Sequence, residues 1–98
     1  MKTEERLPNN YNVVTFQELI FTPHPMGMGE QCIVRFPNGF AASIVKGPYT
    51  YGGPEGLYEI AVFDKEGNIT YDTPITDDVL GYLNETDVSD TLIKIKEL

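Results

Sequence analysis

The sequence predicts a single α+β domain, in which an antiparallel meander of four strands is followed by two short C-terminal helices. Its 98 residues suit one domain (1–98) with one core. Two β-rich runs, residues 31–45 and 57–72, each enclose a turn signal. Two helix-start patterns follow them. A hydrophobic content of 41% favours a folded chain despite a net charge of −8.

The segment before the first hairpin is ambiguous. Residues 1–12 are polar and are expected to form a loosely ordered lead-in. Thr15 and Glu18 have the spacing of a capping box, but two prolines close behind limit any helix to one or two turns. Residues 15–21 therefore fit a helix or a strand. A short strand near residues 19–22 would be the fifth of the sheet.

The first hairpin has the clearest local signal. Residues 31–36 and 40–45 are rich in β-formers and flank Pro37-Asn38-Gly39, and an Asn-Gly pair between such runs is typical of a tight hairpin turn. Because side chains alternate along a strand, inward-facing residues are expected at every second position. In the first strand these are Cys32, Val34 and Phe36.

The second hairpin follows a glycine-rich loop. Residues 47–56 contain four glycines and two prolines, which indicates a loop. Residues 57–63 and 69–71 then flank a turn in which Gly67 can adopt the positive φ that tight turns require. Apolar residues occupy both faces of residues 57–63, so this strand is expected at the centre of the sheet.

The stretch TPITDDVLGYLNETDVSD, residues 73–90, holds five of the fifteen acidic residues. Thr76 stands where an N-cap belongs, and Asp77 and Asp78 follow in the first turn, where the helix dipole stabilises negative charge. This pattern predicts a helix over residues 77–83. Most of the acidity is thus interpreted as helix-start chemistry.

A second helix is predicted directly afterwards. Asn84 is interpreted as the stop of the first helix and Thr86 as the N-cap of the next, over residues 87–97. Residues 92–98 also alternate between apolar and charged side chains, so a final strand remains an alternative.

Charge and composition narrow the class of partner. Residues 1–46 hold four basic and four acidic residues, whereas residues 47–98 hold three and eleven. This balance disfavours direct binding of nucleic acid and favours either a basic protein partner or a simple role of the charge in solubility. Residues 1–12 are polar and lack the apolar stretch of a secretion signal, no apolar run approaches membrane-spanning length, and the single cysteine suits a reducing compartment. We therefore expect a cytoplasmic protein that does not contact membranes.

Few residues are suited to catalysis or to holding a metal. His24, the single histidine, would need Ser43, Ser89 or Cys32 as a partner, and Cys32 is better explained as a core residue. The carboxylates lack the calcium-loop pattern, and one cysteine with one histidine cannot form a structural zinc site. We expect no cofactor, no metal and no enzyme activity. A small enzyme using His24 or clustered carboxylates is the least favoured alternative.

Two sets of residues are candidates for binding a partner. Tyrosines in or beside a glycine loop are typical of recognition surfaces, although they can also pack over the sheet as a lid. Acidic groups interleaved with an aromatic can imitate spaced phosphates. The first set is Tyr49, Tyr51 and Tyr58, and the second is Asp72, Asp77, Asp78 and Tyr82.

The run YGGPEGLYEIAVFDKEGNITYDTPITDDVLGYL, residues 51–83, resembles a stretch found in small uncharacterised proteins encoded by bacteriophages and prophages. The resemblance is carried by YGG, GLYE and YDTPITDDV, and it offers no activity or functional residue to transfer. It implies the cytoplasm of a bacterial or phage-infected cell and a module that modulates another protein.

Three hypotheses follow from these patterns. The leading one is a non-enzymatic, protein-binding accessory module of phage or prophage type. The alternative is an acidic decoy that imitates nucleic acid and blocks a DNA- or RNA-binding protein. A homodimer formed through an exposed sheet edge is compatible with either.

Overall fold

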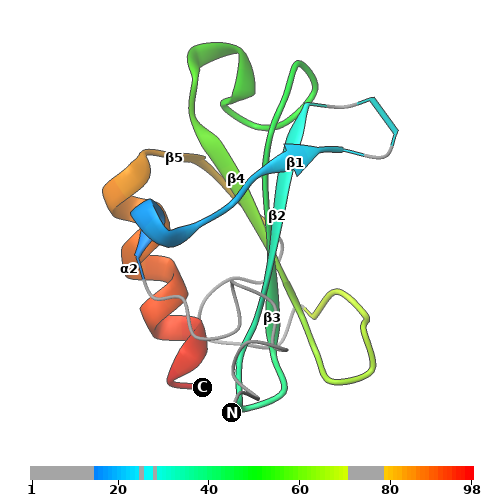
Figure 1. Ribbon diagram of the computed structural model, residues 1–98, viewed down its shortest axis with the longest axis vertical. Helices are drawn as coiled ribbons and strands as arrows, with labels where there is room; N and C mark the ends of the chain where they lie inside the picture. Colours follow the sequence, from blue (N-terminus) through cyan, green and yellow to red (C-terminus); the bar gives the residue numbers. More distant parts are fainter. Residues whose placement is uncertain (1–14, 25, 28, 71–78) are drawn as a thin grey trace, which may run out of the picture.

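The computed structural model describes residues 15–24, 26–27, 29–70 and 79–98. Within them, five strands form one antiparallel sheet in the order β1-β2-β3-β4-β5 (Figure 1). The strands are β1 (Thr22–Pro23), β2 (Glu30–Arg35), β3 (Ala41–Lys46), β4 (Tyr58–Phe63) and β5 (Leu80–Leu83). The helical elements are the 3₁₀ turns η1 (Phe16–Glu18) and η2 (Gly53–Glu55) and the α-helix α2 (Glu85–Lys96). The predicted α+β meander is confirmed, with one C-terminal helix instead of two.

The first hairpin forms as predicted. Cys32 pairs with Ile44 across β2 and β3. In the turn, the Gly39 N–H donates to the Phe36 carbonyl at 3.0 Å and the Phe36 N–H donates to the Phe40 carbonyl at 2.9 Å. Gly39 has a φ of +97°, a conformation that a residue with a Cβ rarely adopts. The Asn-Gly signal thus acts through this glycine.

The second turn repeats the same pair of bonds. The Gly67 N–H donates to the Asp64 carbonyl at 3.0 Å, and the Asp64 N–H donates to the Asn68 carbonyl at 2.8 Å. Among the described residues, the second strand of this hairpin is represented by an isolated bridge between Ile69 and Phe63 and by the Thr70 N–H, which donates to the Val62 carbonyl at 2.8 Å. Positions 71 and 72 of the predicted strand lie outside the described residues. β4 is nevertheless central, as predicted, since it pairs with β3 and β5.

The predicted helix over residues 77–83 is wrong where the structure describes it, because residues 80–83 form β5. Leu83 pairs with Tyr58 on β4. The edge of β4 that does not pair with β3 provides the backbone groups for this pairing. Seven residues make a helix too short to persist without strong packing, and Gly81 weakens a helix further. Asp77 and Asp78 lie outside the described residues.

The start of α2 corrects a second prediction. Asn84 is the N-cap of this helix, not the stop of an earlier one, and Thr86 lies inside the helix. The Asn84 Oδ1 accepts from the Asp87 N–H at 2.8 Å, while an Asp87 carboxylate oxygen accepts from the Asn84 N–H at 3.1 Å. Asp acts here where the usual capping box has Glu, three residues after the cap. The helix runs to Lys96, so the alternative of a final strand is wrong.

The segment before β2 forms a single helical turn within residues 15–21 and a separate two-residue strand after it. The Thr15 N–H donates to the Glu18 carboxylate at 3.2 Å, so the capping box is present, and it starts the single turn η1. Two residues of β1 then pair with β2 at the edge of the sheet. The short strand predicted near residues 19–22 therefore forms later, at Thr22–Pro23, and residues 19–21 belong to no element.

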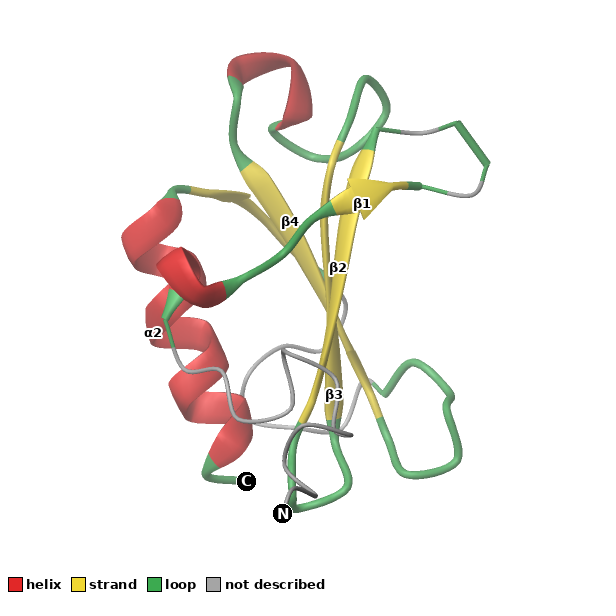
Figure 2. Ribbon diagram, in the orientation of Figure 1, coloured by secondary structure: helices red, strands yellow, loops and turns green. Residues whose placement is uncertain are grey.

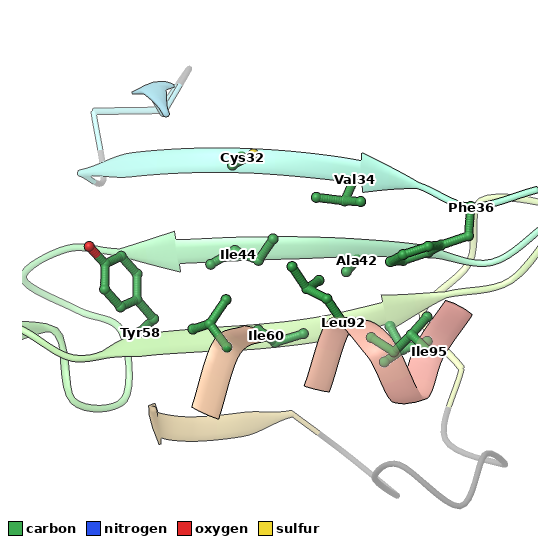
Figure 3. Close-up of a cluster of buried hydrophobic side chains, with 11 residues drawn as sticks. Cys32, Val34, Phe36, Ala42, Ile44, Tyr58, Ile60, Leu92 and Ile95 are labelled. Atoms are coloured by element: carbon green, nitrogen blue, oxygen red, sulfur yellow. The ribbon is translucent and has the colours of Figure 1, made fainter. Parts of the chain in front are cut away.

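The core lies between α2 and one face of the sheet (Figures 1 and 2). Its buried apolar side chains come from alternate positions of β2, β3 and β4 and from the inner face of α2, as Figure 3 shows. They are Cys32, Val34, Phe36, Ala42, Ile44, Tyr58, Ile60, Val62, Val88, Leu92 and Ile95. None of the described helices has the length and apolarity needed to span a bilayer.

Hydrogen bonds to other segments hold α2 in place at its C-terminal end and at Ser89. The Asn38 amide, in the first hairpin turn, donates to the Ile95 carbonyl at 2.8 Å and to the Lys96 carbonyl at 3.0 Å. These carbonyls belong to the last turn of the helix, where intrahelical donors run out. On the other side, the Phe16 N–H donates to the Ser89 hydroxyl at 2.7 Å and so holds η1 against α2.

Candidate interaction surface

The loop between β3 and β4, residues 47–56, is compact. The Thr50 hydroxyl donates to the Gly47 carbonyl and accepts from the Gly47 N–H, both at 3.0 Å. A Cβ at Gly53 would overlap the Gly47 carbonyl oxygen, so a glycine is required there. The glycines predicted as loop formers therefore also allow the chain to pack closely on itself.

This loop is docked on β5. The Tyr82 N–H donates to the Tyr51 carbonyl at 3.1 Å, and the Tyr51 N–H donates to the Glu59 carboxylate at 2.8 Å. A Cβ at Gly81 would overlap the Cβ of Tyr51, and a Cβ at Gly52 would lie 2.8 Å from the Tyr82 Cα. Glycine on both sides thus permits the two backbones to approach closely.

Three tyrosines project outward from this junction. Tyr49 is 80% exposed, Tyr51 is 59% exposed and Tyr82 is 61% exposed. We call Tyr49, Tyr51 and Tyr82 the tyrosine surface. The sequence grouped Tyr82 with the acidic residues, whereas the structure places it next to Tyr51.

Tyr82 is also held in an unfavourable backbone conformation. Its φ is +58°, and it is the one non-glycine residue with a positive φ in the described part of the chain. For a residue with a Cβ this conformation costs about 1 kcal/mol or more. Such strain persists where neighbouring contacts impose it and is frequent at functional sites. Here the bond to the Tyr51 carbonyl fixes the residue and leaves its ring exposed.

Tyr58 belongs to the core instead. It is 8% exposed, and its ring lies 5.1 Å from that of Phe16 and 5.5 Å from that of Phe21, measured between centroids. The Lys46 ammonium lies 4.9 Å from the ring centroid, in a cation–π contact. The signal for this burial was present in the sequence, because Tyr58 alternates in phase with the inward-facing Ile60.

The predicted acidic patch is only partly visible. Asp72, Asp77 and Asp78 lie outside the described residues, so their proximity to Tyr82 stays a prediction. Two exposed carboxylates do come from elements beside the tyrosine surface: Glu55 in η2, and Glu85 at the start of α2. Sequence reasoning did not select them, because Tyr82 lies in a strand and Glu85 begins a helix, and no local spacing relates the two.

The residues considered for catalysis have structural surroundings. His24 lies in the connection between β1 and β2. Its ring Nδ1 accepts from the Met26 backbone N–H at 3.1 Å, and its backbone N–H donates to the Gly29 carbonyl at 2.7 Å. Cys32 is buried in the core, and this burial raises the pKa of its thiol above the ordinary value, which keeps it protonated and weakly nucleophilic. In the part of the chain that the structure describes, no three His, Cys, Asp or Glu side chains are grouped so as to hold a metal ion.

Comparisons with known proteins do not identify a relative. No family model matches the chain, and neither a curated protein nor a solved structure shows significant similarity to it. The resemblance of residues 51–83 to phage-encoded proteins stays a prediction. Function must be inferred from the surfaces and cavities of the chain itself.

Proposed function

We propose that the protein is a non-enzymatic module that binds another protein through the tyrosine surface. The observation that supports this function is the exposure of Tyr51 and Tyr82 at a junction that is rigidly built from glycine contacts and backbone hydrogen bonds. Tyrosine provides a large contact area with few rotatable bonds. Because the backbone beneath these rings is already ordered, binding loses little conformational entropy.

The charge around this surface favours a basic partner. Glu55 and Glu85 are exposed on elements next to it, and residues 47–98 carry eleven acidic but only three basic residues. Complementary charge speeds association and excludes acidic competitors more than it raises affinity. The partner proposed here offers apolar grooves for the rings within a basic surround. The proposed setting is the cytoplasm of a bacterial or phage-infected cell.

The test compares the wild-type chain with Tyr51→Ala and Tyr82→Ala in affinity capture from bacterial lysate, followed by titration of the retained partner in purified form. Each substitution is expected to weaken binding about tenfold, because buried tyrosines are frequent energetic centres of interfaces. Ile93→Ala is the matched control. Ile93 is a partly exposed apolar residue on α2, away from the loop, and its replacement should leave the affinity unchanged.

The decoy hypothesis predicts a different result for the same complex. Eleven acidic residues over residues 47–98 are the observation in its favour. A decoy would compete with DNA or RNA for its partner, and its affinity would fall steeply between low and physiological salt. If the wild type and both tyrosine variants bound equally and nucleic acid competed with them, the decoy hypothesis would be favoured over binding through the tyrosine surface.

A further inference from the structure

A separate feature lies at the opposite end of the sheet from the tyrosine surface, where the turns after β2 and β4 lie (Figure 1). The two turns are in contact, because the aliphatic stem of Lys65 lies over Gly39. A Cβ built on Gly39 would be 2.7 Å from the Lys65 Cγ. The side chain of one turn therefore leans across the backbone of the other.

A pocket of about 560 Å³ opens between these turns and the sheet. This volume lies within the range of roughly 300–1,000 Å³ that is usual for small-ligand sites. Its lining includes Ile33, Ala41 and Phe63 as apolar walls, with Arg35 and Lys65 among the charged groups. Ile33 and Arg35 alternate along β2 with the core residues Cys32 and Val34, so the pocket lies on the face of the sheet opposite α2.

The charged groups at this pocket are not equivalent. One Asp64 carboxylate oxygen accepts from the backbone N–H groups of Glu66 and Asn68, both at 3.0 Å, so the turn itself stabilises this charge. By contrast, no hydrogen bond or ion pair joins Arg35 or Lys65 to a carboxylate among the described residues. Both side chains are exposed, so with respect to the described residues their cationic groups are accessible to a ligand.

We propose that this pocket binds a small organic anion, with an aromatic or other apolar body against Ile33, Ala41 and Phe63 and an anionic group at Arg35 and Lys65. A guanidinium can hold a carboxylate or sulfonate with two parallel hydrogen bonds. The net charge of −8 opposes anions in general. At physiological ionic strength, however, exposed charges farther away than about 8 Å are largely screened. Asp64 and Glu66 also line the pocket, but the N–H groups of the turn already stabilise the Asp64 charge. Glu66 is therefore the main acidic group that opposes an anion at Arg35 and Lys65.

The test uses two fluorescent probes with the same aromatic skeleton. 8-Anilinonaphthalene-1-sulfonate carries the anionic group, and N-phenyl-1-naphthylamine lacks it. Titrated into the full chain, the sulfonate is expected to bind saturably at one site and more tightly than the neutral probe. Arg35→Gln removes a charge-assisted contact. It should weaken binding of the sulfonate about fivefold to tenfold and leave the affinity for the neutral probe unchanged.

Two further variants locate the site. Lys94→Gln removes the same charge from the exposed side of α2, on the other face of the sheet, and should leave both affinities unchanged. Ala41→Leu enlarges the side chain at the wall of the pocket, reduces the space for the aromatic body and should abolish binding of both probes. Circular dichroism and a urea titration establish that each variant is folded, because partly folded chains also bind the sulfonate.

A measurement on the wild-type chain requires no variant. On addition of the sulfonate, the amide NMR signals of Gly39 and Gly67, one in each turn, should shift, while those of Gly52 and Tyr82 at the tyrosine surface should not. Absence of saturable binding, or shifts confined to the tyrosine surface, would overturn the proposal. So would sulfonate binding that Arg35→Gln and Ala41→Leu both leave intact. None of these outcomes bears on the protein-binding function proposed above.

Discussion

The face of the sheet that α2 covers and the tyrosine surface are organised in opposite ways. Under the helix, side chains make the contacts, and Ile44, Ile60 and Leu92 have no exposed area. At the tyrosine surface, the backbone makes the contacts: glycines pack against the neighbouring chain, and the Tyr82 N–H donates to the Tyr51 carbonyl. The largest side chains there point to solvent.

This difference separates two kinds of residue. Burial of apolar area is the main stabilising contribution at the helix-covered face, since each buried Leu or Ile contributes roughly 1.5–3 kcal/mol to folding. Exposed rings gain little of this energy, and the positive φ of Tyr82 opposes folding. Features that cost stability without a gain in the folded chain are expected where the chain contacts something else.

The largest effect on stability is expected in the core. Leu92→Ala removes a fully buried side chain between α2 and the sheet and should lower the free energy of unfolding by about 2–5 kcal/mol, because it combines lost burial with a cavity. Urea unfolding followed by circular dichroism measures this change. Binding to the partner should be unchanged wherever the variant remains folded.

The neighbouring position supplies the control. Ile93 is 39% exposed on the same helix, so Ile93→Ala should cost less than about 1 kcal/mol. Similar losses for Leu92→Ala and Ile93→Ala would show that α2 is not packed on the sheet as described, and the contrast between the two regions would fail.

The helix-covered face was also the part that sequence could predict. Alternation along β2 identified Cys32 and Val34 as inward-facing, and the Asn-Gly pair located the turn that follows. Both signals are local, because a turn and a strand are each encoded in a few adjacent residues. The end of α2 was predicted within one residue for the same reason.

β5 was missed because its cause is not local. Residues 80–83 have no strand pattern strong enough to override the acidic helix-start signal before them, and they become a strand through pairing with the open edge of β4. The error then displaced the helix start, since Asn84 was taken as a stop instead of an N-cap. Asn84 can either end or begin a helix, and its role can be assigned only when the structure of the residues on both sides is known.

The site was predictable in composition but not in arrangement. The exposure of Tyr49 and Tyr51 is one of the two outcomes that their place in a glycine loop allowed. The contact between Tyr51 and Tyr82 joins residues that are distant in sequence, and it depends on the absence of a Cβ at Gly81. No short sequence pattern encodes such a contact.

An intermediate effect is expected where the loop meets β5. In Gly81→Ala the new Cβ would overlap that of Tyr51, so the loop must shift, at a cost of about 1–3 kcal/mol. Partner binding should weaken as well, because the tyrosines are displaced. Urea unfolding and titration of the partner measure the two effects on the same sample.

Gly56→Ala is the control for this substitution. Gly56 has a positive φ, but a Cβ there meets nothing within 4 Å. It should therefore cost only the conformational penalty, about 1–2 kcal/mol, with no loss of binding. If Gly81→Ala left binding intact, the close approach of the loop to β5 would not be what orders the tyrosine surface.

The smallest change in stability, and the most direct test of strain, is expected at Tyr82 itself. Tyr82→Ala and Tyr82→Gly remove the same ring, but only glycine relieves the positive φ, so the glycine variant should be the more stable of the two by about 1 kcal/mol. Ile93 lies inside α2, where glycine disfavours the helix, so Ile93→Gly should be less stable than Ile93→Ala by about 1 kcal/mol. Urea unfolding of all four variants gives both differences, and partner binding should be weakened equally in the two Tyr82 variants. An alanine variant as stable as the glycine variant would mean that the backbone at Tyr82 is unstrained, and the argument that its exposed ring is maintained at a cost to folding would lose its basis.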